Sequence, residues 1–305
     1  MSKILVTGGA GFIGSNLVDV LVDEGHDVVI VDNLSTGSKE NINQKAKFFE
    51  IDITDNENLI KIFEEVKPEA VFHLAAQASV ITSAEDPSQD VRINVIGTIN
   101  LLQCCKKLNV KKFIFSSTGG AIYGDNAPRP TVETATERPV SPYGIDKLCA
   151  ENFIRFFTSD DFQTVRLRYA NVYGPRQNSK GEAGVIAIFS SRMLAGEPVT
   201  IYGDGTHTRD YVYVGDIVAA NLKALESTKS DVYNIGTGQE TSVNDIVMQL
   251  QVLTSSKAEV KHAPYKAKEQ ASSSLNATKA QGSLSWQSEV PLDEGLKKTI
   301  AWFKK

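Results

Sequence analysis

The sequence of 305 residues has few of the side chains that hold metal ions or build disulfide frameworks. It contains three cysteines and four histidines. Cys104 and Cys105 are adjacent, Cys149 stands alone, and no Cys-x-x-Cys pair occurs. An odd number of cysteines without paired spacing excludes a disulfide scaffold and a structural zinc site. The histidines are scattered without metal-ligand spacing, so we predict that the protein binds no metal.

Long hydrophobic runs and an excess of positive charge are also missing. No apolar run is long enough to span a bilayer, and "MSKILVTGG" enters a predicted strand at once, without the pattern of a signal peptide. The net charge is −5 and no basic stripe stands out, which argues against nucleic acid as the main partner. We therefore expect a cytoplasmic protein that binds neither membranes nor nucleic acid.

The first half of the chain alternates strand and helix signals. Helical patterns, among them 56–66 and 88–109, separate short β-branched and aromatic runs. Those runs are 3–7, 27–32, 47–51, 70–75 and 112–117. Buried strands that alternate with helices predict a parallel sheet with crossover connections and helices on both faces. The predicted fold class is α/β, a doubly wound parallel Rossmann sheet with a second, smaller α/β domain.

The regular alternation of strand and helix signals ends after residue 170. A strand at 164–174 leaves the sheet, and a Gly-rich polar stretch at 174–184 precedes a predicted helix at 185–195 and a strand at 199–203. Strand–turn signals at 209–216 and 231–238 can return to the first domain. We therefore predict that the Rossmann domain comprises 1–170 with 210–236, and the smaller domain 171–209 with 237–305.

The predicted helix at 88–109 is apolar around most of its circumference. Val91, Ile96, Ile99 and Cys105 are among its apolar residues. A helix of this kind is buried on more than one side. One side can face the sheet, while the other is covered either by another helix of the same chain or by a second copy in a homodimer. A homodimer would form through this helix and the one near 142–157.

A glycine-rich loop, "VTGGAGFIGS", follows the first predicted strand and opens a helix. Gly8, Gly11 and Gly14 are spaced by three, which lets the backbone turn tightly and approach a pyrophosphate at the helix N-terminus. The second strand ends at Asp32, whose carboxylate can hold both ribose hydroxyls of an adenosine and would repel a 2′-phosphate. The pattern predicts a dinucleotide site that takes NAD rather than NADP.

Two later strand ends support that site. Asp52 ends the third strand, where its side chain can reach the adenine edge. The fourth strand runs into the small residues Ala75 and Ala76, beside which a dinucleotide can lie. Close packing explains each of these features equally well, so they depend on the glycine loop.

A tyrosine and a lysine stand four residues apart, behind a strand that ends in hydroxyls. Tyr143 and Lys147 share one face of a helix that "SP" at 141–142 begins. The ammonium group and a positively charged nicotinamide would stabilise the phenolate, which makes Tyr143 a general base for a sugar or alcohol hydroxyl. Ser116 lies at the end of the strand at 112–117 and Thr118 directly follows it, on the side of the sheet where ligands bind.

Together these motifs identify the chain as a member of the extended short-chain dehydrogenase/reductase family. Within it, the chain is most similar to the UDP-glucose 4-epimerases of bacterial and archaeal type. The resemblance covers nearly the whole chain, with the motifs in the family's order. They are "GGAGFIG", Asp32, "HLAAQ", Asn94 in "RINVIGT", "SSTGGAIYG", "YGIDK", "RYANVYGPRQ" and "GDGTHTRDYVYVGD".

The resemblance implies a role for each matching residue. Tyr143 would be the base, Lys147 would hold the nicotinamide ribose, and Thr118 would bond the reacting hydroxyl. Residues that would bind NAD, besides Tyr143 and Lys147, are Gly8, Gly11, Phe12, Ile13, Gly14, Asp32, Asn33, Leu34, Ser35, Thr36, Gly37, Asp52, Ile53, Leu74, Ala75, Ala76, Gln77, Asn94 and Ser116. Residues that would bind the UDP-sugar are Thr118, Tyr143, Asn171, Val185, Tyr202, Arg209 and Lys266.

The resemblance also implies a reaction and its alternatives. In the epimerase, the sugar is oxidised at carbon 4 by NAD, turns over as a 4-keto intermediate, and is reduced on its other face. Related 4,6-dehydratases carry an Asp–Glu pair, and decarboxylases a Glu, where this chain has Gly119 and Gly120, so both are disfavoured. A net oxidoreductase, a UDP-glucuronate 4-epimerase or a non-catalytic nucleotide sensor are further alternatives.

The C-terminal part departs from the family pattern. Lys266 stands where the family has an arginine for the diphosphate, and lysine lacks the bidentate fork. Ala271 replaces a second arginine and Asn276 an aspartate. Ser273 falls where a bulky residue limits sugar size in some relatives, which predicts room for an N-acetyl group at carbon 2.

Overall fold

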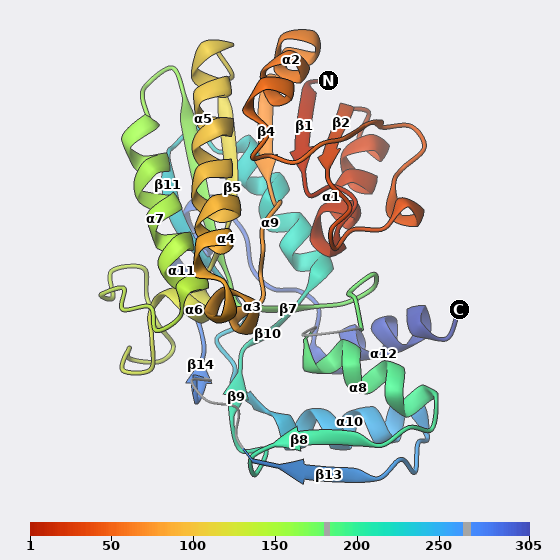
Figure 1. The fold of residues 1–305 in the computed structure, drawn as a ribbon. Helices are drawn as coiled ribbons and strands as arrows, with labels where there is room; N and C mark the ends of the chain where they lie inside the picture. Colours follow the sequence, from red (N-terminus) through yellow and green to blue (C-terminus); the bar gives the residue numbers. More distant parts are fainter. Residues whose placement is uncertain (180–183, 265–269) are drawn as a thin grey trace.

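A computed structural model describes residues 1–179, 184–264 and 270–305. Its centre is a sheet of seven parallel strands in the order β11-β6-β5-β4-β1-β2-β3 (Figure 1). The strands are β1 (Lys3–Thr7), β2 (Asp27–Asp32), β3 (Lys47–Glu50), β4 (Ala70–His73), β5 (Lys112–Thr118), β6 (Gln163–Tyr169) and β11 (Asp231–Ile235). The predicted doubly wound sheet is confirmed, and residues 231–235 return to it as expected.

Helices cover both faces of this sheet because its strands are apolar on both sides. In β1, Ile4 and Val6 join one core, while Leu5 between them joins the other. The first core lies under α1 (Phe12–Asp23), α9 (Val214–Glu226) and α11 (Thr278–Leu284). The second lies under α2 (Asn56–Val66), α5 (Gly97–Lys107) and α7 (Pro142–Phe157).

The helix expected over 88–109 is interrupted in the structure. Its parts are α4 (Pro87–Val91), a π-helical stretch η2 (Arg92–Ile96) and α5, and α3 (Val80–Glu85) precedes them. A π-helical stretch widens the helix and re-aims side chains, and such stretches are common at functional sites. Here it contains the buried Asn94, one of the residues expected at the cofactor.

The later part of the chain builds a second group of elements with its own core (Figure 1). Helices α8 (Val185–Leu194), α10 (Val243–Thr254) and α12 (Leu292–Phe303) pack there against strands β8 (Val199–Tyr202) and β13 (Val260–Ala263). Short strands connect the two groups. They are β7 (Asn171–Tyr173), β9 (Thr208–Arg209), β10 (Tyr211–Tyr213), β12 (Thr241–Ser242) and β14 (Ser272–Ser273).

Several elements differ from the sequence prediction. The strand expected at 164–174 is divided at Ala170 into β6 and β7, and β7 pairs with β10 instead of the main sheet. Helix α9 and strand β13 were not predicted. Short helical turns η1 (Lys39–Asn41) and α6 (Gly119–Ile122) also occur, for which no element was predicted. Among the described residues, no helix is long and apolar enough to cross a membrane.

Candidate active site

The glycine loop between β1 and α1 leaves no room for side chains at two of its positions. Gly8 has a φ of +72°, and a Cβ there would lie 2.6 Å from the backbone nitrogen of Ala75. A Cβ on Gly14 would lie 2.1 Å from the carbonyl oxygen of Gly8. No side chain caps the start of α1, so its first N–H groups are available to an anion. The loop therefore fits a dinucleotide pyrophosphate.

Asp32 is fixed at the end of β2, beside this loop. One carboxylate oxygen accepts a hydrogen bond from the backbone N–H of Ala10 at 3.0 Å, and the other from that of Leu34 at 2.8 Å. Each oxygen keeps a lone pair for a ribose hydroxyl. The predicted cofactor stretch from Asn33 to Gly37 then turns back to the loop, where Ser38 donates its N–H to the Ala10 carbonyl at 3.1 Å.

Asp52 lies next to this stretch because β3 pairs with β2. Asn33 donates its side-chain amide to Asp52 at 2.8 Å. Burial opposes the ionised form, but hydrogen bonds from Thr54 and Asn33, with Arg92 nearby, outweigh it and lower the pKa of Asp52. Ile53, which follows, is buried against Gly97 at the start of α5. The hydrogen bonds from Asn33 and Thr54 therefore hold the Asp52 carboxylate in one orientation just after the end of β3.

The end of β4 is tied to both β1 and the π-helical stretch. The N–H groups of Leu74 and Ala75 donate to the carbonyl and hydroxyl oxygens of Thr7, at 3.1 and 3.3 Å. Gln77 and Asn94 exchange two hydrogen bonds, from the Gln77 N–H at 3.1 Å and from the Asn94 amide to the Gln77 carbonyl at 2.9 Å. The predicted residues Leu74, Ala75, Ala76, Gln77 and Asn94 therefore form one continuous wall.

The three hydroxyls that end β5 point to different partners. Ser116 bonds the hydroxyl of Tyr169. Ser117, on the opposite face, donates to the buried carboxylate of Glu151. Thr118 bonds the hydroxyl of Tyr143. Alternation along the strand thus leaves Ser116 and Thr118 on the site's face and gives Ser117 a structural partner.

Tyr143 and Lys147 lie on α7 as their spacing predicts. The Ser141 hydroxyl caps the helix by accepting the Gly144 N–H at 3.2 Å. Lys147 is 3% exposed, and its ammonium nitrogen lies 4.4 Å from the centre of the Phe115 ring. Burial lowers the pKa of Lys147 to about 8, against the attraction of Glu151 and Asp90.

The pKa of Tyr143 differs from the sequence expectation. Burial raises the pKa of Tyr143, Asp90 raises it further, and the bond from Thr118 only partly offsets them. Lys147 alone therefore does not make Tyr143 a base at neutral pH. A further positive charge, such as that of an oxidised nicotinamide, is required beside the phenol.

A cavity of about 840 Å³ opens between these residues and the later elements of the chain. Six of the seven predicted substrate residues line it. They are Thr118, Tyr143, Asn171, Val185, Tyr202 and Arg209. The seventh, Lys266, lies outside the described residues. The structure thus brings together side chains from β5, α7, β7, α8, β8 and β9.

Sequence reasoning missed part of the lining of this cavity. Ile188, Phe189 and Arg192 of α8 also face it, as does Gln270. The three α8 residues share a helix face with Val185, so extending the helical period from Val185 would have found them. Gln270 carries no comparable signal.

Ser273, expected near the sugar, is not among the described residues that line the cavity. It is 7% exposed, and its strand β14 pairs with Arg209 of β9. The prediction that it makes room for an N-acetyl group therefore gains no support from the cavity lining.

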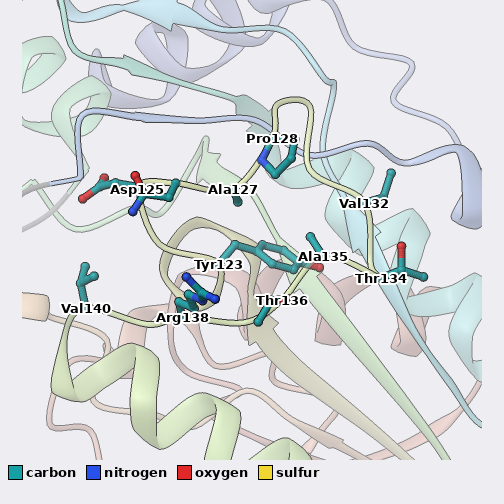
Figure 2. A pocket seen from close by; sticks show the side chains of 11 residues that line it. Tyr123, Asp125, Ala127, Pro128, Val132, Thr134, Ala135, Thr136, Arg138 and Val140 are labelled. Carbon is teal, nitrogen blue, oxygen red and sulfur yellow. The ribbon is translucent and has the colours of Figure 1, made fainter.

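A second cavity, of about 490 Å³, lies under the segment from Tyr123 to Val140 (Figure 2). Figure 2 shows Tyr123 and Arg138 on one side of it, and Asp125 and Ala127 on the strand of chain that passes above them. Val140 lines both cavities.

The chain matches the NAD-dependent epimerase/dehydratase family over residues 4–236. It belongs to this family. NAD is therefore its cofactor, in agreement with the glycine loop and Asp32.

Similar proteins share almost the entire length of the chain. A UDP-glucose 4-epimerase from Thermotoga maritima, solved with UDP-glucose, is 51% identical with a TM-score of 0.97 and covers 99% of this chain and 98% of its own. One from Thermus thermophilus, solved with NAD, is 42% identical with a TM-score of 0.94 and the same coverage. The UDP-glucose 4-epimerase of Mycolicibacterium smegmatis is 40% identical over 99% of this chain and 98% of its own length.

The family also contains other reactions at lower identity. A UDP-N-acetyl-α-D-glucosaminuronate decarboxylase from Bacillus cytotoxicus is 33% identical over 99% of this chain and 98% of its own length. Family membership alone therefore does not identify the reaction of this chain.

Proposed function

We propose that the protein is a 4-epimerase of UDP-hexoses that interconverts UDP-glucose and UDP-galactose, and also their N-acetyl forms. The observation that carries the proposal is the Thr118–Tyr143 hydrogen bond at a cavity where the next two residues are glycines. This arrangement can remove a hydroxyl proton, and none of the described residues that line the cavity is an acid that could expel a leaving group.

The two glycines differ in what they allow. A Cβ on Gly119 would lie 2.3 Å from the side chain of Leu275, so this position is closed. Gly120 lines the cavity, and its nearest contact for a Cβ is the Asn171 amide oxygen at 3.5 Å. A side chain would fit there, yet the chain has none. A 4,6-dehydratase needs an acid and a base to remove water, so the open position argues against that reaction and against decarboxylation.

The residues of the chain divide the chemistry between them. NAD held in this site would supply the hydride acceptor and donor for the sugar. Tyr143 takes the hydroxyl proton and gives it back, while Thr118 holds that hydroxyl in place by hydrogen bonding. Lys147 holds the nicotinamide ribose and supplies positive charge near the phenol. Because the proton returns from the same residue, the cycle consumes no external acid or base.

The nucleotide is held by the later elements. We assign the diphosphate to Arg209, whose guanidinium is fixed by carbonyl oxygens of Thr208 and Ala271 at 2.8 and 3.3 Å. Asn171, Val185 and Tyr202 would contact the uridine. Lys266 would be a second charge for the diphosphate. The residues predicted as cofactor ligands keep the roles that the family resemblance gives them.

The domain division and a homodimer are part of this proposal. The separate core around α8, α10 and α12 supports a nucleotide-sugar domain of 171–209 with 237–305, and the sheet supports an NAD domain of 1–170 with 210–236. An exposed apolar stripe on adjoining helices supports dimerisation through α4–α5 and α7. Its residues are Val91, Ile96, Ile145, Phe153 and Phe156. Phe156→Glu would yield monomers in sedimentation if the dimer forms there, whereas an unchanged sedimentation coefficient would contradict it.

Incubation with UDP-sugars tests the function. The purified protein, without added cofactor, would receive UDP-glucose, UDP-N-acetylglucosamine and UDP-glucuronate separately, with products resolved by NMR. We expect equilibration of 4-epimers for the first two, and none with Tyr143→Phe that still carries NAD. Release of water, carbon dioxide or NADH, or turnover of UDP-glucuronate alone, would refute the assignment. Conversion of UDP-glucose alone would limit it to the smaller sugars.

A further inference from the structure

Two carboxyl groups meet in the interior beside the catalytic helix. Asp90 of α4 is 1% exposed and Asp146 of α7 is 4% exposed. They lie close enough for a hydrogen bond if one of them carries a proton. In each, the second carboxyl oxygen is buried without a partner, and neither forms an ion pair within the part of the chain that the structure describes.

Asp90 holds in place the wall formed by Leu74 to Gln77 and Asn94, which we call the cofactor wall. One of its oxygens accepts hydrogen bonds from the Gln77 amide at 2.6 Å and from the Asn94 amide at 3.1 Å. Gln77 in turn donates to the carbonyl of Ser79 at 2.9 Å. The loop after β4 and the π-helical stretch therefore converge on a single carboxylate oxygen.

Asp146 lies between the two catalytic residues in sequence. Tyr143 is three residues before it and Lys147 follows it, so its position is coupled to the turn of α7 that carries them. Asp90 also acts on this turn through its charge. It adds to the rise that burial causes in the pKa of Tyr143, and it opposes the fall that burial causes in the pKa of Lys147.

Two buried carboxylates without a cation between them cannot both be ionised at low cost. One shared proton would remove the repulsion and give both unpartnered oxygens a hydrogen bond. In line with this geometry, burial and the neighbouring Asp90 raise the pKa of Asp146 well above its ordinary value.

We propose that Asp90 and Asp146 share one proton, and that this protonated pair is a positioning element which fastens the cofactor wall at Gln77 and Asn94 to the turn of α7 that carries Tyr143 and Lys147. The proposal rests on the proposed function for its kinetic consequence only. Neither residue is among the described residues that line the cavity, so the pair is not catalytic.

Several other titratable groups surround the pair on α7 and β4. On α7, Lys147 faces Glu151 one turn further along, and burial, followed by the nearby Asp146, raises the pKa of the Cys149 thiol. On β4, burial and Lys147 keep the pKa of His73 well below its ordinary value, so His73 is neutral. The Gln77 and Asn94 amides are neutral, and both already donate to the other oxygen of Asp90.

Infrared spectroscopy of the NAD-loaded enzyme tests the shared proton directly. A protonated carboxyl has a carbonyl stretch that a carboxylate lacks. We expect this band in the wild type at pH 6 and its loss on titration to pH 9. Asp146→Asn and Asp90→Asn should each lack it, while Asp160→Asn, at an exposed position after α7, should retain it. A band that is absent from the wild type, or unchanged in both pair variants, would overturn the proposal.

Turnover tests the positioning role. In Asp146→Asn, the amide can donate to Asp90 as the protonated carboxyl does, so kcat should stay close to that of the wild type. Asp146→Ala has no donor at this position. A resulting rise of about one in the pKa of Tyr143 would lower kcat about tenfold and leave KM for the UDP-sugar unchanged. Equal loss of kcat in both variants would refute this role. The infrared measurement does not depend on turnover, so it tests the shared proton independently of the proposed reaction.

Discussion

Replacing Lys147 by methionine should make the protein more stable and inactive at the same time. The lysine is 3% exposed, and its pKa falls from an ordinary 10.5 to about 8. A fall of about 2.5 means that burying the charged form costs about 3 kcal/mol. Methionine has a similar length, no charge, and a sulfur that packs well against an aromatic ring such as that of Phe115.

The size of this stability gain depends on pH. Between pH 8 and 10.5 the unfolded chain binds a proton at Lys147 and the folded chain does not, so wild-type stability rises with pH. Below pH 8 the full cost is present. The advantage of Lys147→Met should therefore be about 3 kcal/mol at pH 7 and should fall to less than half by about pH 9.5.

Thermal unfolding of cofactor-free protein measures this advantage without the contribution of bound NAD. For a chain of 305 residues, about 3 kcal/mol corresponds to a rise in Tm of about 5 °C. Lys106→Met, at an exposed position of α5, is the matched control and should leave Tm nearly unchanged. A Tm of Lys147→Met at or below the wild-type value at pH 7, or an advantage that is the same at pH 9.5, would refute the reasoning. Loss of activity by about 10²-fold or more should accompany the rise.

Three further substitutions follow from the geometry. Tyr143→Phe should lower kcat by about 10²- to 10⁴-fold with bound NAD retained, and activity close to wild type would contradict its role as the base. Gly14→Ala should abolish NAD retention because its Cβ would lie 2.1 Å from a loop carbonyl, whereas Gly282→Ala, with nothing within 4 Å, should be harmless; cofactor absorbance after purification distinguishes them. Arg168→Met should destabilise the protein by about 3–5 kcal/mol in urea, because it leaves the buried Glu151 without its partner at 2.7 Å. An unchanged midpoint of urea unfolding would refute this explanation.

The parts of the fold that follow from local pattern were predictable. The boundaries of α2 agree with the predicted 56–66, and α7 begins at the serine and proline that predict its start. Strand β13 was not predictable in this way, since it is short, half polar, and formed by pairing with β8 sixty residues earlier. The π-helical stretch η2 was equally hidden, because a single π-helical turn of five residues is too short to leave a period of its own in the apolar pattern.

The site shows the same limit. The positions of Tyr143, Lys147 and Thr118 follow from helix and strand periods and from the rule that ligands bind at the carboxyl ends of parallel strands. The pKa of Tyr143 does not, since it depends on burial and on Asp90, which is distant in sequence. The pairing of Asp90 with Asp146 joins residues 56 positions apart by number, and no local pattern signals it.

The cavity is bounded by two separately packed cores, and this has a consequence for how the protein can change. The proposed catalytic residues lie on β5 of the main sheet and on α7 packed against it, whereas much of the remaining cavity lining comes from α8, β8 and β9. Substitutions on α8 can reshape the recognition surface while repacking only their own core. Selection, or an engineer, can therefore retune which nucleotide sugar is accepted and inherit an unaltered redox centre.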